Sequence, residues 1–389
     1  MKRKKVSELA KQIRGVSYNP EDLHENLDEN SVTLLRANNI FEGRINFDDV
    51  VYVDKSKVTM EQYLCKGDIL VCASSGSKQL VGKAASFNFE TECTFGAFCK
   101  VVRPNQDVAN YLSVYFQSNA YRRKISEVAI GANINNIRNE HIDALELPIG
   151  SNAENEKVVA SFSLLQQIID GRKQQLHKLD DLVKARFVEL FGDPITNPRG
   201  FEKVPLSKLA EIKIGPFGSL LHKEDYIQAG HALVNPSHII DGKISIDSKL
   251  TVSEEKFNEL RAYHLRVGDV VMGRRGEMGR CAVVTENGLL CGTGSLLIRT
   301  NGEVTADYIQ KIISFPSFKK TIEEMAVGQT MPNLNVPIVS RFQIIKPPFE
   351  VQKAYYDFVS QIDKSKAVIQ KALNETQLLF DCLMQKYFQ

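Results

Sequence analysis

The stretches YLSVYFQSNAYRRKI at Tyr111–Ile125 and YIQKIISFPSFKKTI at Tyr308–Ile322 share an apolar pattern and a pair of adjacent basic residues. The offset that relates them, 197 residues, also aligns Gly82–Asn136 with Gly279–Asn333 without a gap. Nine of the aligned positions are identical: Gly82/Gly279, Ala85/Ala282, Ala109/Ala306, Tyr111/Tyr308, Ile125/Ile322, Glu127/Glu324, Ala129/Ala326, Gly131/Gly328 and Asn136/Asn333. An internal repeat of this length decides the fold class before any single element does.

The repeat continues upstream with small changes in length. KGDILV at 66–71 corresponds to VGDVVM at 267–272, and NNIFEGRI at 38–45 corresponds to SHIIDGKI at 237–244. Short β-type runs predict strands at Val51–Val53, Ile69–Cys72, Val270–Met272, Cys281–Val284 and Leu296–Ile298. Tyr111–Ile125 and Tyr308–Ile322 predict amphipathic helices, the second of them interrupted or ended by Pro316. Each half is therefore expected to form an irregular, largely antiparallel sheet with a few helices.

A long helix is predicted after each copy of the repeat. The first covers Glu154–Phe191 and stops at Gly192 and Pro194; the second covers about Glu350–Phe388. The first seam contains Phe162, Leu165, Ile169, Leu176, Leu179, Val183 and Leu190, and the more polar second seam contains Phe358, Ile362, Ser365, Ile369, Ala372, Thr376, Leu379 and Leu383. Spacings of three and four residues favour packing against another helix, most simply of these two helices on each other in antiparallel orientation. Each would be roughly 57 Å long.

These observations predict an α+β protein with a pseudo-two-fold internal repeat. Two similar domains, each a mixed or antiparallel sheet plus helices, would be separated by two long antiparallel coiled-coil helices. The predicted boundaries are 1–150 for the first domain, 151–193 for the first long helix, 194–347 for the second domain and 348–389 for the second long helix.

Composition excludes several classes of protein. The net charge is +2, from 49 basic and 47 acidic residues, which excludes a polybasic binder but allows a local basic face. The seven cysteines form no C-x-x-C pair, so we expect reduced thiols in a cytoplasmic protein rather than disulfides or zinc. No window approaches 18 apolar residues, so no membrane partner is expected.

Motifs for catalysis are not convincing. GSKQLVGKA at Gly76–Ala84 resembles a phosphate loop but has five residues between its glycines, and Ala84 replaces the metal-binding hydroxyl. KPPF at Lys346–Phe349 resembles the tetrapeptide of amino-methyltransferases, but Lys346 cannot accept a hydrogen bond from the target amine. We interpret it as an extended linker into the second long helix. No catalytic or metal-binding residue is predicted, although a self-contained DNA methyltransferase or nuclease remains an alternative.

The first binding candidate is a stretch rich in glycine and arginine. GRRGEMGR at Gly273–Arg280 spaces glycines three residues apart and supplies Arg274, Arg275 and Arg280. Arginine reads guanine or clamps phosphate, although a hairpin with solvated arginines fits equally well. The corresponding stretch of the first half, ASSGSKQLVGK, offers Ser74, Ser75, Ser77, Lys78, Gln79 and Lys83. Different polar side chains on a shared framework are expected if two related domains read different ligands.

Two further stretches are binding candidates. KIGPFGSLLHK supplies Lys213, Ser219, His222 and Lys223. Asn133, Asn135, Asn136 and Arg138 in the first half correspond to Gln329, Thr330, Asn333 and Asn335 in the second. Asn and Gln can pair with adenine, while ordinary loop capping is the other interpretation. The basic pairs Arg122-Arg123 and Lys319-Lys320 are expected to contact phosphate or solvent.

Combined, these residues resemble the DNA specificity subunit of a Type I restriction–modification system over nearly the whole chain. The motifs that carry the resemblance are LFGDP at Leu190–Pro194, VPLSKLAEIKIGPFGS at Val204–Ser219, GDVVMGRRGEMGRCAVV at Gly268–Val284, GQTMPNLN at Gly328–Asn335 and the closing segment Pro347–Phe388. The first half departs most, because it has no Arg-rich glycine loop.

The resemblance implies a non-catalytic subunit whose two target-recognition domains each read one half of a split sequence in double-stranded DNA. It implies that the helices form a spacer and dock two modification subunits, which bind S-adenosylmethionine and methylate adenine. Restriction subunits would add translocation and cleavage, so ATP and Mg are expected on partners and no cofactor on this chain. Half-sites one turn apart lie about 34 Å from each other, and the gap between them should widen if the first long helix is lengthened. A specificity subunit of another restriction class, or an adaptor that assembles proteins without reading DNA, remains open.

Overall fold

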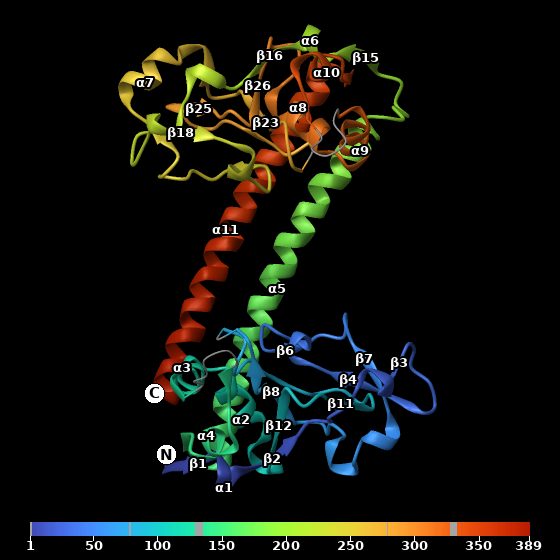
Figure 1. Ribbon diagram of the computed structural model, residues 1–389, viewed down its shortest axis with the longest axis vertical. Helices are drawn as coiled ribbons and strands as arrows, with labels where there is room; N and C mark the ends of the chain where they lie inside the picture. Colours follow the sequence, from blue (N-terminus) through green and yellow to red (C-terminus); the bar gives the residue numbers. More distant parts are fainter. Residues whose placement is uncertain (1, 78, 129–134, 278, 327–332) are drawn as a thin grey trace. The chain divides into compact units, whose positions relative to one another are not determined.

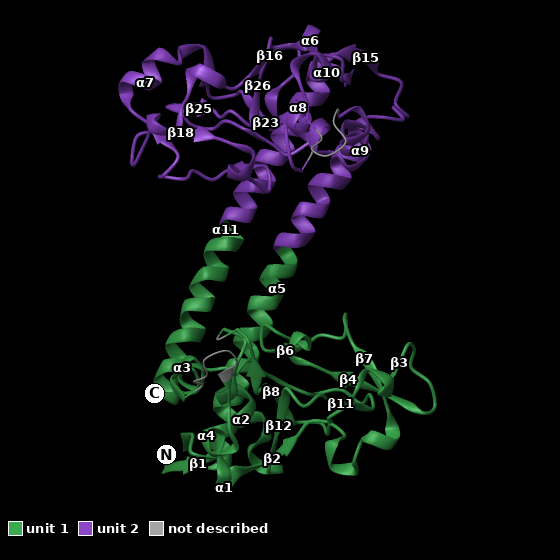
Figure 2. Ribbon diagram, viewed as in Figure 1, with its two compact units in different colours: residues 1–175, 368–389 green, residues 176–367 purple. Residues whose placement is uncertain are grey.

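The computed structural model describes residues 2–77, 79–128, 135–277, 279–326 and 333–389 (Figure 1). The chain divides into two compact units, one of Met1–Gln175 with Val368–Gln389 and the other of Leu176–Ala367 (Figure 2). We refer to them as unit 1 and unit 2 and describe each by itself.

In its described residues unit 1 combines short strands and short helices with parts of two long helices. Its strands are β1 Lys2–Lys5, β2 Ala10–Arg14, β3 Leu23–His24, β4 Ser31–Leu35, β5 Ile40–Phe41, β6 Arg44–Ile45, β7 Val51–Asp54, β8 Ile69–Cys72, β9 Ser74–Ser75, β10 Ala84–Ser86, β11 Cys93–Phe95, β12 Cys99–Pro104, β13 Asn135–Asn136 and β14 Glu146–Ile149. Its helices are α1 Val6–Leu9, α2 Ala109–Phe116, α3 Asn119–Val128, α4 Asn139–Asp143 and the long α5 Asn152–Phe191, which continues into unit 2.

Unit 2 follows largely the same order of elements, with a helix and a strand added between 254 and 265. Its strands are β15 Glu202–Pro205, β16 Ala210–Ile214, β17 Tyr226–Ile227, β18 His231–Val234, β19 Ile239–Ile240, β20 Lys243–Ile244, β21 Thr251–Val252, β22 His264–Leu265, β23 Val270–Gly273, β24 Cys281–Val283, β25 Leu289–Cys291, β26 Ser295–Thr300 and β27 Gln343–Lys346. Its helices are α6 Leu206–Leu209, α7 Glu254–Glu259, α8 Ala306–Ser314, α9 Pro316–Met325, α10 Val336–Ser340 and the long α11 Phe349–Phe388, whose end belongs to unit 1.

Sheet topology confirms the internal repeat. One sheet of unit 1 has the order β10-β8-β12-β2, and its counterpart in unit 2 has the order β24-β23-β26-β16, with antiparallel pairing throughout. The second sheets are β11-β4-β7-β3 and β22-β25-β18-β21-β17, in which only the pairs β11–β4 and β18–β25 are parallel. The predicted α+β class and largely antiparallel sheets are therefore confirmed, and the five predicted strands all form.

One predicted helix is divided. Tyr111–Ile125 forms the two helices α2 and α3 instead of one, because the buried Ser118 hydroxyl accepts a hydrogen bond from the Tyr121 backbone N–H at 3.1 Å and so caps a new helix. In the second copy Pro316 occupies the first turn of α9, which confirms the predicted interruption.

The two long helices form at the predicted positions, each with 40 residues. Ser151 and Glu154 cap the start of α5 reciprocally: the Ser151 N–H donates to the Glu154 carboxylate at 2.8 Å, and the Ser151 hydroxyl accepts from the Glu154 N–H at 3.4 Å. Gly192, with φ +72°, ends the helix as predicted.

Within each unit, segments of α5 and α11 pack against each other. In unit 1 the Phe162 ring lies 5.2 Å from that of Phe380, and Arg172 donates to the Thr376 hydroxyl. In unit 2 the Lys366 ammonium lies 2.6 Å from the Asp180 carboxylate, and the Phe187 ring lies 5.6 Å from that of Tyr355. Contact positions fall along α11 as they rise along α5, so the predicted antiparallel packing is confirmed inside each unit.

The predicted seam of α11 is wrong at two positions. Ser365 and Leu379 are exposed, and the neighbouring Lys366 and Phe380 face α5 instead. Residues three positions apart and residues four positions apart both lie on the same face of a helix. The apolar pattern alone therefore does not decide which of two neighbouring residues faces the partner helix.

Each unit has an aromatic core that includes residues from both long helices. In unit 1 the buried Phe388 ring lies 5.4 Å from Tyr111 and 5.6 Å from Tyr115. In unit 2 the buried Phe191 ring lies 5.1 Å from Tyr308 and 5.4 Å from Tyr355. Thus the C-terminal end of α11 completes the core of unit 1, and the C-terminal end of α5 completes the core of unit 2.

Replacing Phe388 by alanine should destabilise unit 1, although the residue lies in the last turn of its helix. Removing a fully buried Phe costs about 3–5 kcal/mol, whereas Leu378→Ala, at a side chain that is 64% exposed on the same helix, should change the free energy of unfolding by less than about 0.5 kcal/mol. Urea denaturation measures the free energy of unfolding of both variants. Hydrogen exchange should show that Phe388→Ala reduces protection in Tyr111–Phe116. Equal effects of the two substitutions would contradict the assignment.

Candidate nucleic-acid interface

Four chain segments converge in unit 1 at the ends of β2, β8 and β11. Backbone hydrogen bonds join Val16 N to Phe95 O at 2.8 Å, Ala97 N to Val16 O at 2.9 Å, and Ala73 N to Phe98 O at 2.9 Å. A further bond, from Ile137 N to Ala73 O at 2.8 Å, brings in the segment around β13. We call this group of segments the unit 1 loop cluster.

Unit 2 repeats this cluster. Gly215 N donates to Ser295 O at 3.1 Å, Arg274 N donates to Gly294 O at 3.0 Å, and Leu334 N donates to Arg274 O at 2.9 Å. We call this group the unit 2 loop cluster. The bonds of Arg274 and Leu334 correspond to those of Ala73 and Ile137, so these loops are held together in the same way in both units, although the side chains on them differ.

Glycine makes the close approach of these loops possible. A Cβ atom on Gly15 would lie 2.2 Å from the carbonyl oxygen of Gly96, and a Cβ on Gly215 would lie 2.0 Å from that of Gly292. Both distances are far below van der Waals contact with backbone atoms, so any larger residue would push the loops apart.

The structure brings the first and third binding candidates together. In unit 1 Ser74 and Ser75 of β9 pair with Asn136 and Asn135 of β13. In unit 2 Arg275 forms a backbone bridge with Asn333, whose side-chain oxygen accepts a hydrogen bond from Arg274 Nε at 3.0 Å. Burial, helped by the charge of Arg275, lowers the pKa of Arg274. Arg275 is exposed and occupies the position that Ser74 occupies in unit 1.

Basic residues of α3 and α9 form hydrogen bonds or ion pairs with loops of their own unit. Arg122 donates to the backbone carbonyls of Val81 at 2.7 Å and Gln79 at 2.9 Å, and Lys319 lies 3.2 Å from the Glu277 carboxylate. Arg122 and Lys319 are half-buried and each also holds a loop of its own unit, while their contact with phosphate stays a prediction. Arg280 also pairs with Glu277, so Arg280 and Lys319 share one carboxylate.

The other candidates are placed as follows. Lys213 on β16 pairs with Glu211 at 2.8 Å, and Lys83 lines a separate cavity of about 390 Å³ with Arg122. Arg138 is exposed and lies 3.4 Å from the Glu140 carboxylate. Ser77, Gln79, Ser219, His222 and Lys223 are exposed in their loops. Among the residues described, no hydrogen bond or ion pair joins Ser219, His222 or Lys223 to the arginines of the unit 2 loop cluster. Lys78, Asn133, Gln329 and Thr330 lie outside the described residues, as does the side chain of Asn135.

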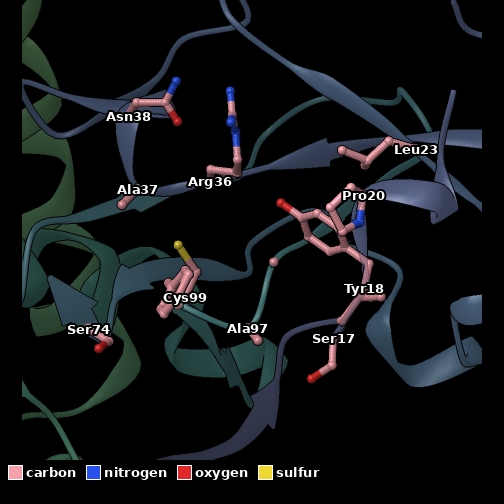
Figure 3. Close-up of a pocket in the computed structure, with 13 residues that line it drawn as sticks. Ser17, Tyr18, Pro20, Leu23, Arg36, Ala37, Asn38, Ser74, Ala97 and Cys99 are labelled. Atoms are coloured by element: carbon pink, nitrogen blue, oxygen red, sulfur yellow. The ribbon is translucent and has the colours of Figure 1, made fainter. Parts of the chain in front are cut away.

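Two adjoining cavities open at the unit 1 loop cluster. The first, of about 580 Å³, is lined by Tyr18, Arg36, Asn38 and Ser74 among others, and the Tyr18 ring projects toward its middle (Figure 3). The second, of about 490 Å³, is lined by Arg14, Ala73, Ser74, Ala97, Phe98, Cys99, Lys100, Asn136, Ile137, Arg138 and Asn139. Ser74, Ala97, Phe98 and Cys99 line both cavities.

The second cavity concentrates positive charge. Its described lining contains Arg14, Lys100 and Arg138 and no carboxylate. Burial and, secondly, the neighbouring Arg14 guanidinium lower the pKa of Lys100, whereas the nearby Asp143 carboxylate raises it, so the positive charges there are compensated only in part. Phe98, between the two cavities, is 70% exposed. A cationic surface with an exposed aromatic ring has the chemistry that binds a nucleic acid strand.

Sequence reasoning missed Arg14, Lys100 and Phe98. Arg14 ends β2 and Lys100 is the second residue of β12, so neither belongs to a recognisable loop motif. A signal was present for Phe98, because GAFC at 96–99 places an aromatic residue in a turn between two strands, where small and polar residues prevail.

Neither a metal site nor a membrane-spanning helix is found in the described part of the chain. Its His, Cys, Asp and Glu side chains form no group of three or more that could hold a metal ion. None of its helices is long and apolar enough to cross a membrane. Lys346 ends β27 and pairs with Glu303, and α11 begins at Phe349, so the KPPF stretch is the predicted linker.

Comparison with known proteins agrees with this geometry. Residues 198–377 match the family described as the Type I restriction modification DNA specificity domain. The chain is 27% identical over 391 residues to the Type I restriction enzyme EcoKI specificity subunit of Escherichia coli (strain K12), a match that covers 95% of this chain and 83% of that protein. A 180-residue match to the StySPI specificity subunit of Salmonella potsdam is 37% identical and covers 46% of this chain and 39% of the relative.

Solved structures share the fold. The S subunit of a Type I restriction–modification system from M. genitalium superposes with a TM-score of 0.57 at 15% identity, covering 100% of this chain and 96% of that one. A chain from a study of complex assembly and conformational transition in the type I R-M system gives a TM-score of 0.61 at 15% identity, with 99% and 97% coverage.

Replacing Gly15 by alanine should disturb the unit 1 loop cluster. The new methyl group would meet the Gly96 carbonyl, which is backbone and cannot rotate away, so we expect a loss of about 1–3 kcal/mol in the free energy of unfolding. Faster hydrogen exchange at the Val16 and Ala97 amides should accompany it. Gly171→Ala is the control: it lies within α5 with no atom within 4 Å of the added Cβ, and should stabilise by up to about 1 kcal/mol. Unchanged exchange in Gly15→Ala would contradict the prediction.

Proposed function

We propose that this chain, which belongs to the family of Type I restriction–modification DNA specificity subunits, recognises a split, asymmetric sequence in double-stranded DNA. The observation that carries the proposal is the repeated loop cluster. Its backbone is held by corresponding hydrogen bonds in both units, while corresponding positions carry Ser74 in one and Arg275 in the other. Equal frameworks with unequal polar side chains suit two domains that read different bases.

The exposed and half-buried polar residues of each loop cluster are the proposed DNA contacts. In unit 2, Arg275 has the exposure and reach to contact base edges, and Arg274 is oriented by its hydrogen bond to Asn333. In unit 1, Ser74, Ser75 and Arg138 are the corresponding candidates. Since the ion pair with Glu277 holds the Arg280 side chain within its own loop, we assign Arg280 to positioning the loop rather than to reading bases.

The wider assembly follows from the family. The curated relatives are named as specificity subunits of Type I restriction enzymes, and we propose that this chain likewise assembles with modification and restriction subunits on DNA. Two modification subunits, docked on α5 and α11, would carry S-adenosylmethionine and methylate adenine, while ATP and Mg would act on the restriction subunits. The chain itself would supply recognition and no catalytic group.

Mapping methylated adenine in cells with and without this protein tests the function directly. We expect two modified half-sites of different sequence, separated by a fixed gap of several unspecified base pairs, only when the chain is present. Methylation that persists without it, or that the purified chain performs alone with S-adenosylmethionine, would refute the proposal.

Arg275→Ala should relax only the half-site read by unit 2. Loss of a bidentate contact to guanine costs about 1–3 kcal/mol and widens the choice of base at that position. Replacement of the whole loop Gly273–Arg280 should change the same half-site and no other. Arg261→Ala, which removes an exposed arginine from another part of unit 2, is the matched control for charge. A change in both half-sites, in the methylation map of either variant, would show that the assignment of units to half-sites is wrong.

Lengthening both long helices by one turn should widen the gap between the half-sites. Four residues inserted after Gln175 in α5 and four after Ala367 in α11 add about 6 Å to each helix and keep the side chains paired within each unit. Methylation mapping should then show a gap longer by about two base pairs, since one base pair spans about 3.4 Å. An insertion of four residues after Gly302, in the loop before α8, is the control and should leave the gap unchanged. An unchanged gap in the helix variant would reject the spacer role.

A further inference from the structure

We infer that unit 1 engages DNA through a contact that the corresponding positions of unit 2 do not repeat: the Phe98 ring inserts as a wedge between two base pairs, and the cationic cavity beside it holds the adjacent phosphate. This inference rests on the proposed function and deepens it, because it names a contact that distinguishes the two half-sites. The cavity is the one of about 490 Å³ that Arg14, Lys100 and Arg138 line.

Phe98 has an exposed ring on a fixed backbone. The side chain is 70% exposed, yet the Phe98 carbonyl oxygen accepts hydrogen bonds from the Ala73 N–H at 2.9 Å and the Ser74 N–H at 3.0 Å. The flanking residues are also held, Ala97 N by Val16 O at 2.9 Å and Cys99 N by Gly96 O at 2.8 Å. Such a ring adds little to the stability of the fold, since it stays in water. It is instead already held in place for a partner, which lowers the entropy cost of binding.

The cavity next to Phe98 selects an anionic partner. Arg14, Lys100 and Arg138 face it, and no carboxylate belongs to its described lining. Lys100 and Arg14 are close enough that the charge of Arg14 contributes to lowering the pKa of Lys100. A phosphate entering between these groups would relieve their repulsion and accept hydrogen bonds from both. Asn136 and Asn139 on the same cavity add neutral polar groups.

Unit 2 has other residues at the positions that correspond to Phe98 and to the three cations. Arg14, Lys100 and Arg138 correspond to Ile214, Leu296 and Asn335, and Phe98 corresponds to Gly294. Residues that hold the loops together do not vary in this way, because Gly15 and Gly96 correspond to Gly215 and Gly292. The cations and the Phe98 ring are thus absent from these positions of unit 2, whose own exposed ring, that of Phe217, lies two residues after Gly215 in another loop.

Aromatic and phosphate-binding groups in this arrangement fit a DNA strand. Apolar side chains that enter between base pairs unstack them partly, and arginine and lysine on the flanking phosphates hold the strand in place. The shared lining residues Ser74, Ala97 and Cys99 place the ring at the border of the cavity, as a base lies beside its own phosphate. The occupant we assign is therefore one strand of the duplex, at the half-site that unit 1 reads.

Fluorescence of 2-aminopurine tests the wedge in the full chain assembled with its modification subunits. The probe is a duplex with the target found by methylation mapping and with 2-aminopurine placed in turn at each adenine position of the unit 1 half-site. We expect a several-fold rise in fluorescence at one step with the wild-type complex. The rise should be lost with Phe98→Gly, which installs the residue of unit 2, and kept with Phe98→Trp. Affinity for the target should fall about 10-fold in Phe98→Gly.

Two further variants separate the wedge from general effects. Phe41→Ala removes another exposed Phe, 58% exposed, from the β5–β6 hairpin of the same unit and should leave both readouts unchanged. Lys100→Gln should weaken binding to all duplexes alike and reduce the slope of log affinity against log salt by about 0.9, as the loss of one phosphate contact does. An unchanged salt slope would overturn the phosphate part of the inference.

The outcomes distinguish this inference from the proposed function. If the wild-type complex selects its split target but no 2-aminopurine position brightens, or Phe98→Gly binds with unchanged affinity, the wedge is overturned and the proposed function stands. If the wild-type complex binds all duplexes equally, the proposed function itself fails. Thermal melting of each variant confirms that a loss of binding is not a loss of folding.

Discussion

The closure of each aromatic core by a helix that begins in the other unit is the constraint on which the rest of the structure depends. Phe388, at the end of α11, packs on Tyr111 and Tyr115 of unit 1, and Phe191, at the end of α5, packs on Tyr308 of unit 2. Aromatic pairs of this kind contribute about 0.5–1.5 kcal/mol each beyond the burial of apolar area. Neither sheet domain with only the helix that follows it would therefore have a complete core. The loop clusters rest on cores that contain parts of both helices.

A second set of repeated contacts ties the sheets to these cores. Arg103 pairs with the buried Asp68 at 2.7 Å in unit 1, and Arg299 pairs with the buried Asp269 at 2.7 Å in unit 2. A carboxylate with almost no exposure is tolerated only with such a partner, because an unpaired buried charge costs several kcal/mol. The Tyr111 hydroxyl likewise donates to the Pro148 carbonyl at 2.7 Å. Positions that carry buried charge or backbone contact stay alike between the units, whereas the exposed loop positions have diverged.

Features that depend on the order of motifs and on the periodicity of apolar residues could be predicted from the sequence. The repeat, the long helices and the five core strands follow from offsets and apolar patterns, because burial on one face constrains every residue of such elements. The division of α2 from α3 did not follow, since it depends on the single hydrogen bond that the Ser118 hydroxyl accepts. The choice of Phe380 over Leu379 in the helix seam depends on the partner helix, which a local pattern does not contain.

The candidate site shows the same limit more strongly. The Arg274 and Asn333 stretches could be identified by composition, but their contact joins residues that are far apart in sequence. Arg122 and Lys319 have the appearance of phosphate contacts until their partners within the loops are known. Conversely, Phe98 has no polar group that would mark it as a binding residue. Hydrogen bonds to its carbonyl oxygen hold its backbone in the loop, while its ring stays exposed. For surface residues, therefore, residue type indicates what a side chain can contact, and only the tertiary structure decides whether that contact is already made inside the protein. In this chain Arg122, Arg280 and Lys319 already make contacts with loops of their own unit, whereas Arg275 is exposed, and Arg14 and Lys100 line a cavity.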